Sequence, residues 1–169
     1  ERPASVVKEL VENSLDAGST RITVKIQDGG KKLIQVSDNG RGIAPDQLEL
    51  AVSRHATSKI SAFDDLYSLK TNGFRGEALA SVASVSQLSV ASCVQDGEPT
   101  EYIVHAGEEI DKRVCAHEEG TTISVKYLFY QTPARLKFLR TKETETNHIV
   151  NVMTKLALSH PSVEFRLFQ

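Results

Sequence analysis

The sequence predicts an α+β fold in two layers, with a mixed, mostly antiparallel sheet covered by helices on one face. Apolar residues recur at helical spacing near both ends of the chain and in its middle. Between these helices, and again at the end, lie short segments in which apolar and polar residues alternate, as in half-buried strands. Four such segments follow one another across tight polar turns, which favours an antiparallel meander over β-α-β repeats.

Length and composition are those of a single globular domain, and we expect it to span residues 1–169. The formal net charge of −2 gives no overall attraction to nucleic acid or to an anionic membrane. No apolar run is long enough to span a membrane, and no signal peptide is visible. Cys93 and Cys115 match no metal spacing, so we expect two buried free thiols in a reducing compartment.

The first elements are a helix and a hairpin. A helix over residues 3–17 has apolar side chains at helical spacing, and Gly18 can adopt the left-handed conformation that ends it. Residues 22–26 and 34–38 then alternate between apolar and polar on either side of a turn at 28–30. This pattern is typical of a β-hairpin.

The remaining elements follow a long irregular stretch. Pro45 begins a short helix, and residues 54–75 show no sustained period, as in a long loop that is functional or mobile. A second helix begins near Gly76. Four strands are expected after it, over residues 86–94, 100–106, 109–115 and 121–127. A helix over 141–159 and a strand over 163–167 complete the chain.

Glu9 and Asn13 are four residues apart, so they share one face of the first helix. With Glu12 and Asp16 beside them, they could form a solvated acidic face. Alternatively, the Asn13 amide oxygen could bind a Mg²⁺ ion that also bridges phosphates, while Glu9 polarises a water for attack on a γ-phosphate. The helix alone leaves both interpretations open.

Asp38 continues the core-facing stripe of Ile34 and Val36, where a carboxylate is costly unless it is paired. Because Asn39 and Gly40 follow it, Asp38 could simply cap a turn. It could instead accept a hydrogen bond from the adenine amino group at the bottom of a pocket. Glycines at 40 and 42 would let a flat ring approach the backbone. Such a site would reject guanine, which carries a carbonyl at the equivalent position.

Gly73 and Gly76 immediately precede helical periodicity. A glycine-rich turn at a helix N-terminus presents free N–H groups that suit phosphates, although it could also be an ordinary start of a helix. Thr57, Ser58 and Lys59 could add hydroxyl donors and a positive charge, although Lys59 could also be a surface lysine. Neither a GxxxxGK[ST] loop nor a strand-linked GxGxxG is present, which argues against the P-loop and Rossmann sites.

Five runs, in this order, resemble the ATPase superfamily shared by DNA gyrase, heat-shock chaperones, sensor histidine kinases and the MutL mismatch repair proteins. They are ERPASVVKELVENSLDAG (1–18), DNGRGI (38–43), RHATSKI (54–60), GFRGEALASVASV (73–85) and TPARLKFL (132–139). Within this superfamily the resemblance is closest to MutL, and it covers essentially the whole chain.

The resemblance implies a Mg²⁺-dependent ATPase domain in which residues 54–78 order as a lid over the nucleotide. It implies that Glu9 is the general base, that Asn13 binds Mg²⁺ and that Asp38 recognises adenine. Gly42 and Thr121 would line the base pocket. The residues implied to hold the phosphates are Thr57, Ser58, Lys59, Gly73, Phe74, Arg75, Gly76, Glu77, Ala78 and Leu79.

The resemblance also implies partners. These are a mismatch-recognition protein of the MutS type, a downstream nuclease and helicase, and a second copy joined through the ATP-bound N-terminal domains, in the bacterial cytoplasm at the nucleoid. The family pattern has further segments before Glu1 and after Gln169, including a domain that supplies a lysine to the γ-phosphate and a dimerisation region. We therefore expect a fragment that binds ATP weakly, hydrolyses it slowly and stays monomeric.

Several functions are compatible with these residues. One is an ATP-hydrolysing switch, and another is an interaction module in which ATP binding acts and hydrolysis resets it. A kinase is disfavoured because no phosphoacceptor-histidine helix pair is present, and a purely structural domain would leave the polar site residues without a role.

Four basic residues could form a patch for weak DNA contact, although their charges could equally be solvated: Arg135, Lys137, Arg140 and Lys142.

Overall fold

The computed structural model describes residues 2–53 and 78–169. The first part contains α1 (Pro3–Asp16), β1 (Arg21–Gln27), η1 (Asp28–Gly30), β2 (Leu33–Asp38), η2 (Pro45–Gln47) and α2 (Leu48–Val52). The second part contains α5 (Ala78–Ser84), β3 (Gln87–Cys93), β4 (Thr100–His105), β5 (Glu108–Val114), β6 (Gly120–Lys126), α6 (Pro133–Lys137), α7 (Lys142–Ser159) and β7 (Glu164–Phe168). The predicted hairpin, strands and C-terminal helix are confirmed close to their expected positions.

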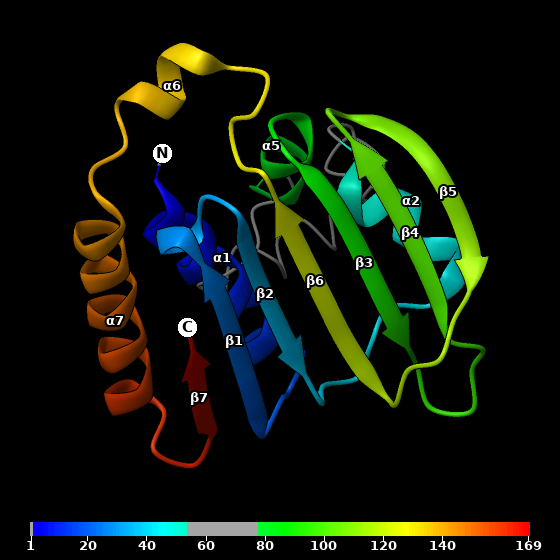
Figure 1. Cartoon of the computed structure of the whole chain (residues 1–169). Coiled ribbons are helices and arrows are strands. Elements are labelled where there is room, and N and C mark those ends of the chain that lie inside the picture. Colours follow the sequence, from blue (N-terminus) through cyan, green and yellow to red (C-terminus); the bar gives the residue numbers. More distant parts are fainter. Residues whose placement is uncertain (1, 54–77) are drawn as a thin grey trace, which may run out of the picture.

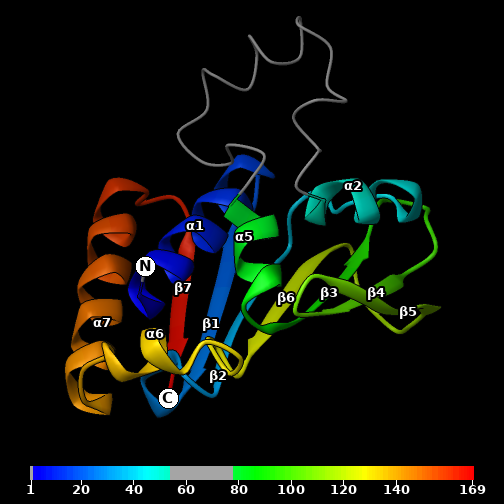
Figure 2. The same ribbon diagram turned by 90° about the horizontal axis from the view of Figure 1, so that it is seen from above.

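The strands form one seven-stranded sheet in the order β5-β4-β3-β6-β2-β1-β7 (Figure 1). Neighbouring strands are antiparallel except β1 and β7, which run parallel. Helices α1, α2, α5 and α7 lie on the same face of the sheet (Figure 2). None of the described helices covers the opposite face. The predicted two-layer α+β fold with a mixed, mostly antiparallel sheet is therefore confirmed.

The core lies between the sheet and the helices. Val7 and Val11 of α1 and Ile22 of β1 are fully buried there, and each such side chain contributes roughly 1.5–3 kcal/mol relative to exposure. Helix α7 adds Ile149 and Met153 and packs along α1. Because α1 is held on both sides, by the sheet and by α7, its polar residues are kept in fixed positions near the end of β2.

Strand β6 does not extend the meander formed by β3, β4 and β5. It returns to the other edge of β3 and pairs with β2 as well, so the prediction of four consecutive strands in one meander is wrong for the fourth strand. The reason is burial: β5 is exposed along its whole length and rich in charge, which suits a sheet edge, whereas β6 is largely buried. This order places Thr121 between Asp38 and Ser92.

Helix α6 is a single short turn, too brief to give a periodic signal in the sequence. No described helix is both long and apolar enough to cross a membrane. Both cysteines are free thiols. Cys93 is buried as expected, but Cys115 is only half-buried, and partial burial raises the pKa of its thiol.

Candidate functional site

A pocket of about 240 Å³ opens between α1, the turn after β2, α5 and β6. The predicted residues that line it are Asn13, Asp38, Gly42, Leu79 and Thr121. They come from segments far apart in the sequence, and the strand order is what joins them. The structure therefore brings the described part of the predicted base and metal sites to one cavity.

Asp38 is held at the end of β2 by three donors. Its Oδ1 accepts hydrogen bonds from the backbone N–H groups of Gly40 at 2.9 Å and Thr121 at 3.2 Å. Its Oδ2 accepts one from the Ser14 hydroxyl at 2.6 Å. A carboxylate oxygen can accept two hydrogen bonds, so Oδ2 keeps capacity for a ligand. The interpretation of Asp38 as the cap of the turn is confirmed, and Asp38 also lines the pocket, while its recognition of adenine stays a prediction.

Ser14 has no counterpart among the site residues predicted from the sequence. It lies on the buried side of α1, following Val7, Leu10 and Val11 at helical spacing, and is 4% exposed. A serine in that row is usually a tolerated small core residue, which is why it gives no clear signal. Here its hydroxyl fixes the carboxylate of Asp38.

The turn after β2 is held tightly against its neighbours. Asn39 Oδ1 accepts hydrogen bonds from the backbone N–H groups of Thr20 and Arg21, both at 2.9 Å, so Asn39 anchors the turn to β1. The Arg41 N–H donates to the Ala17 carbonyl at 3.0 Å. Gly42 has φ +78°, and a Cβ there would overlap the carbonyl oxygen of Cys93. The turn can therefore reach β3 only with glycine at position 42.

Asn13 supplies an oxygen to which the described residues donate no hydrogen bond. Its Oδ1 is buried and accepts no hydrogen bond within residues 2–53 and 78–169. The same holds for Oδ2 of Asp16, three residues further along α1, and both residues line the pocket. Buried polar oxygens normally have partners. Amide and carboxylate oxygens are ligands of the kind that Mg²⁺ prefers, so the donor set fits that ion.

Glu9 lies one turn before Asn13 on α1 and is half-buried. It is not among the described residues that line the pocket, so the structure places it beside the cavity without bringing it into the wall. Most of the predicted phosphate-binding residues lie outside the described part of the chain: Thr57, Ser58, Lys59, Gly73, Phe74, Arg75, Gly76 and Glu77. Ala78 and Leu79 are the first described residues of α5, and Leu79 lines the pocket.

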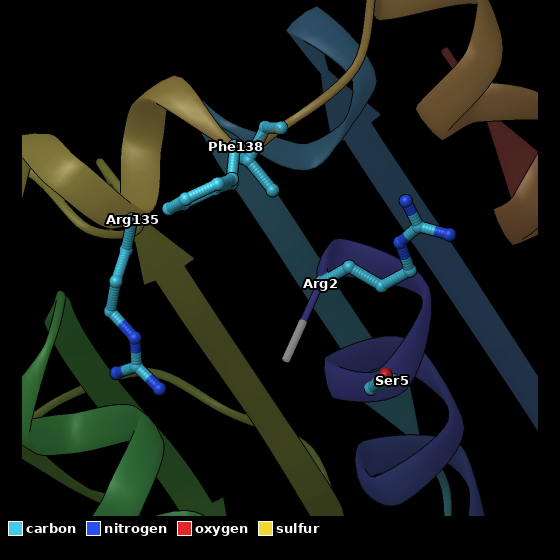
Figure 3. A pocket seen from close by; sticks show the side chains of 5 residues that line it. Arg2, Ser5, Arg135 and Phe138 are labelled. Atoms are coloured by element: carbon cyan, nitrogen blue, oxygen red, sulfur yellow. The ribbon is translucent and has the colours of Figure 1, made fainter.

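A larger cavity, of about 510 Å³, lies elsewhere, between α6 and the start of α1 (Figure 3). Arg135 and Phe138 reach it from α6 and the residue after it, and Arg2 and Ser5 from the start of α1. Arg2 forms a salt bridge with Glu145, with 3.6 Å between Nε of Arg2 and Oε1 of Glu145. None of the predicted nucleotide-binding residues within the described chain contributes to this cavity, so the smaller pocket is the candidate site.

Comparison with known proteins identifies the family of the chain. Residues 1–127 match the family described as histidine kinase-, DNA gyrase B-, and HSP90-like ATPase. The chain is 54% identical to the DNA mismatch repair protein MutL of Halothermothrix orenii, over 99% of this chain and 26% of that protein. It is equally similar to MutL of Pelobacter propionicus, over 98% of this chain and 27% of that protein. The chain thus spans about a quarter of the length of these relatives.

A solved structure agrees with this result. The fold matches the Aquifex aeolicus MutL ATPase domain complexed with ADP, with a TM-score of 0.83 and 37% sequence identity, over 99% of this chain and 60% of that one. The fold that positions the pocket therefore has a solved counterpart. The chain belongs to the histidine kinase-, DNA gyrase B- and HSP90-like ATPase family, and the relatives that it matches over its whole length are MutL proteins.

Proposed function

We propose that this chain binds ATP and hydrolyses it slowly, with Mg²⁺, as the ATPase domain of a MutL-type mismatch repair protein. The observation that carries the proposal is the pocket that Asp38, held by three hydrogen bonds, shares with Asn13 on α1, whose Oδ1 has no hydrogen-bond partner in the part of the chain that the structure describes. The likeness to a MutL ATPase domain complexed with ADP supports it.

Adenine recognition would rest on Asp38. Its Oδ2 has one acceptor position left beyond the bond from Ser14, and the exocyclic amino group of adenine is a donor. Gly42 and Thr121 line the pocket next to it. A purine with a carbonyl at that place would put two acceptors against each other, which costs the desolvation of an unpaired buried group.

Phosphate chemistry would rest on α1. Asn13 would bind Mg²⁺, and when bound the ion would offset the negative charge of the phosphates. Glu9 would take a proton from a water molecule as the water oxygen attacks the γ-phosphorus, and the bond from that phosphorus to the ADP oxygen breaks. We propose that Thr57, Ser58, Lys59 and residues 73–78, with Leu79, hold the phosphates.

The wider role is also part of the proposal, and the MutL relatives support it. In a longer protein, ATP would drive closure over the nucleotide and pairing of two copies. These events would couple a MutS-type recognition protein to a nuclease and a helicase in the bacterial cytoplasm. DNA contact through Arg135, Lys137, Arg140 and Lys142 stays a prediction.

Asn13→Ala tests the metal site. We expect the wild-type chain to bind a non-hydrolysable ATP analogue more tightly with Mg²⁺ than without it, and we expect the variant to lose that gain because the amide ligand is missing. Isothermal titration with and without Mg²⁺ measures both. Asn151→Ala, at an exposed position of α7, is the matched control and should keep the gain. Wild-type binding that does not respond to Mg²⁺ would remove the metal from the proposal.

Asp38→Asn tests base recognition. The amide keeps the shape of the carboxylate but replaces one acceptor oxygen with a donor, which would face the amino group of adenine. We expect ATP binding to weaken by about 1–3 kcal/mol, the cost of a mismatched buried polar pair. Titration with ATP measures the loss, and Asp46→Asn on the exposed surface of η2 is the control. Unchanged affinity in Asp38→Asn would show that the base binds elsewhere.

A further inference from the structure

Ser92 joins three segments directly behind Ile43 and Thr121, two residues of the pocket wall. Its side chain on β3 is fully buried, with 0% exposure. Its Oγ accepts a hydrogen bond from the Ile43 N–H at 2.7 Å and donates one to the Gly120 carbonyl at 2.9 Å. It also lies 2.7 Å from the Thr121 hydroxyl. The turn after β2 and the start of β6 therefore meet at one hydroxyl group.

These contacts fix the direction of the bond between the two hydroxyls. A serine hydroxyl has one proton and two acceptor positions. Since the Gly120 carbonyl can only accept, it takes the single proton of Ser92. The two hydroxyls are in hydrogen-bond contact, so the proton between them must come from Thr121. Thr121 can then offer the pocket only lone pairs.

Thr121 and Asp38 are register partners on β6 and β2, and both line the pocket. Asp38 is an acceptor because it is a carboxylate, and Thr121 is an acceptor because Ser92 takes its proton. Two adjacent acceptors match an amino group, which carries two N–H donors. They oppose a carbonyl oxygen at the same place.

We propose that Ser92 is a positioning residue that sets the base specificity of the pocket, by holding the Thr121 hydroxyl as an acceptor against 6-oxopurines. This inference rests on the proposed ATP function of the pocket and names a determinant of its substrate choice. Ser92 acts through Thr121 and does not touch the nucleotide itself. Loss of its hydroxyl releases the Thr121 proton, which can then turn towards a carbonyl on the base.

Ser92→Ala tests this with ATP and inosine triphosphate, which differ at the six-position substituent and the N1 proton. We expect the ratio of the ATP affinity to the inosine triphosphate affinity to fall roughly tenfold, because the released Thr121 proton can be donated to the carbonyl of inosine triphosphate, whereas for ATP the same hydroxyl is no longer held as an acceptor. A purely structural role would lower both affinities by the same factor, and that result overturns the proposal. Ser89→Ala, also on β3 but paired with Ser124 instead of Thr121, is the matched control and should leave the ratio unchanged.

Thr121→Val keeps the test decisive if Ser92→Ala does not fold. It leaves the bonds from Ser92 to Ile43 and Gly120 in place and removes only the acceptor. We expect the affinity ratio to fall here too, whereas Thr122→Val, whose hydroxyl contacts Ser37, should keep it. When Ser92→Ala is added to Thr121→Val, the affinity ratio should change no further, because the two residues act through one hydroxyl. An unchanged ratio in Thr121→Val overturns the proposal.

The two proposals fail differently. If the wild-type chain binds neither nucleotide, the proposed function fails and this inference fails with it. If the wild type binds ATP in preference to inosine triphosphate and the Ser92→Ala and Thr121→Val variants keep that preference, only this inference fails.

Discussion

Glu9→Gln is expected to lower ATP hydrolysis by roughly 10²–10⁴-fold, the usual contribution of a general base, while ATP binding stays nearly unchanged. The amide has the shape of the carboxylate but cannot take a proton from the attacking water. Phosphate release under saturating ATP measures hydrolysis, and titration with a non-hydrolysable analogue measures binding.

Glu12→Gln is the control for this experiment. Glu12 lies on the same helix, three residues further along, and its carboxylate is 3.2 Å from the ammonium group of Lys8. Its loss should leave hydrolysis close to the wild-type rate. Equal loss in both variants would point to a general effect of charge on α1, and full activity in Glu9→Gln would assign the base to another residue.

Glu9→Gln also separates the two functions that the sequence leaves open. A switch that needs turnover would lose repair in Glu9→Gln. An interaction module would still pair its two copies and recruit its partners with ATP bound, and repair would continue until the bound state had to be reset. Complementation of a repair-deficient strain, together with dimerisation measured with ATP, gives the two readouts.

Much of the fold follows from local patterns in the sequence. Alternation of Ile22, Val24 and Ile26 marks a strand with one buried face, and the buried row on α1 marks a helix. Alternation predicts which face of a strand is buried, but it does not predict which other strand lies beside it in the sheet. The position of β6 depends on contacts between residues distant in sequence, which is why the meander prediction is wrong there.

The site is predictable to the extent that its polar residues interrupt an apolar pattern. Asp38 stands out because it follows Ile34 and Val36 on the buried side of a strand. Ser92 follows Leu88 and Val90 in the same way, and that parallel could have found it. A serine is small and common in cores, however, so the signal is weaker than that of a carboxylate. Its three hydrogen bonds depend on the strand order.

Gly42→Ala is expected to cost the fold about 4 kcal/mol or more, which places it among the most damaging single substitutions. Two effects combine. Gly42 has φ +78°, where an L-residue with a side chain is strained by roughly 1–2 kcal/mol. In addition, its new Cβ would overlap the Cys93 carbonyl, which is part of the backbone of β3 and cannot rotate away.

Gly18→Ala separates the two effects. Gly18 has φ +76°, almost the same backbone conformation, but a Cβ there would meet no atom within 4 Å. It should therefore show the conformational cost alone, about 1–2 kcal/mol. Urea unfolding followed by circular dichroism gives both free energies, and ATP titration should show lost binding only in Gly42→Ala, because Gly42 lines the pocket and Gly18 does not. Equal destabilisation by the two substitutions would mean that the turn can move away from β3, and the close contact between them would then play no part in shaping the nucleotide site.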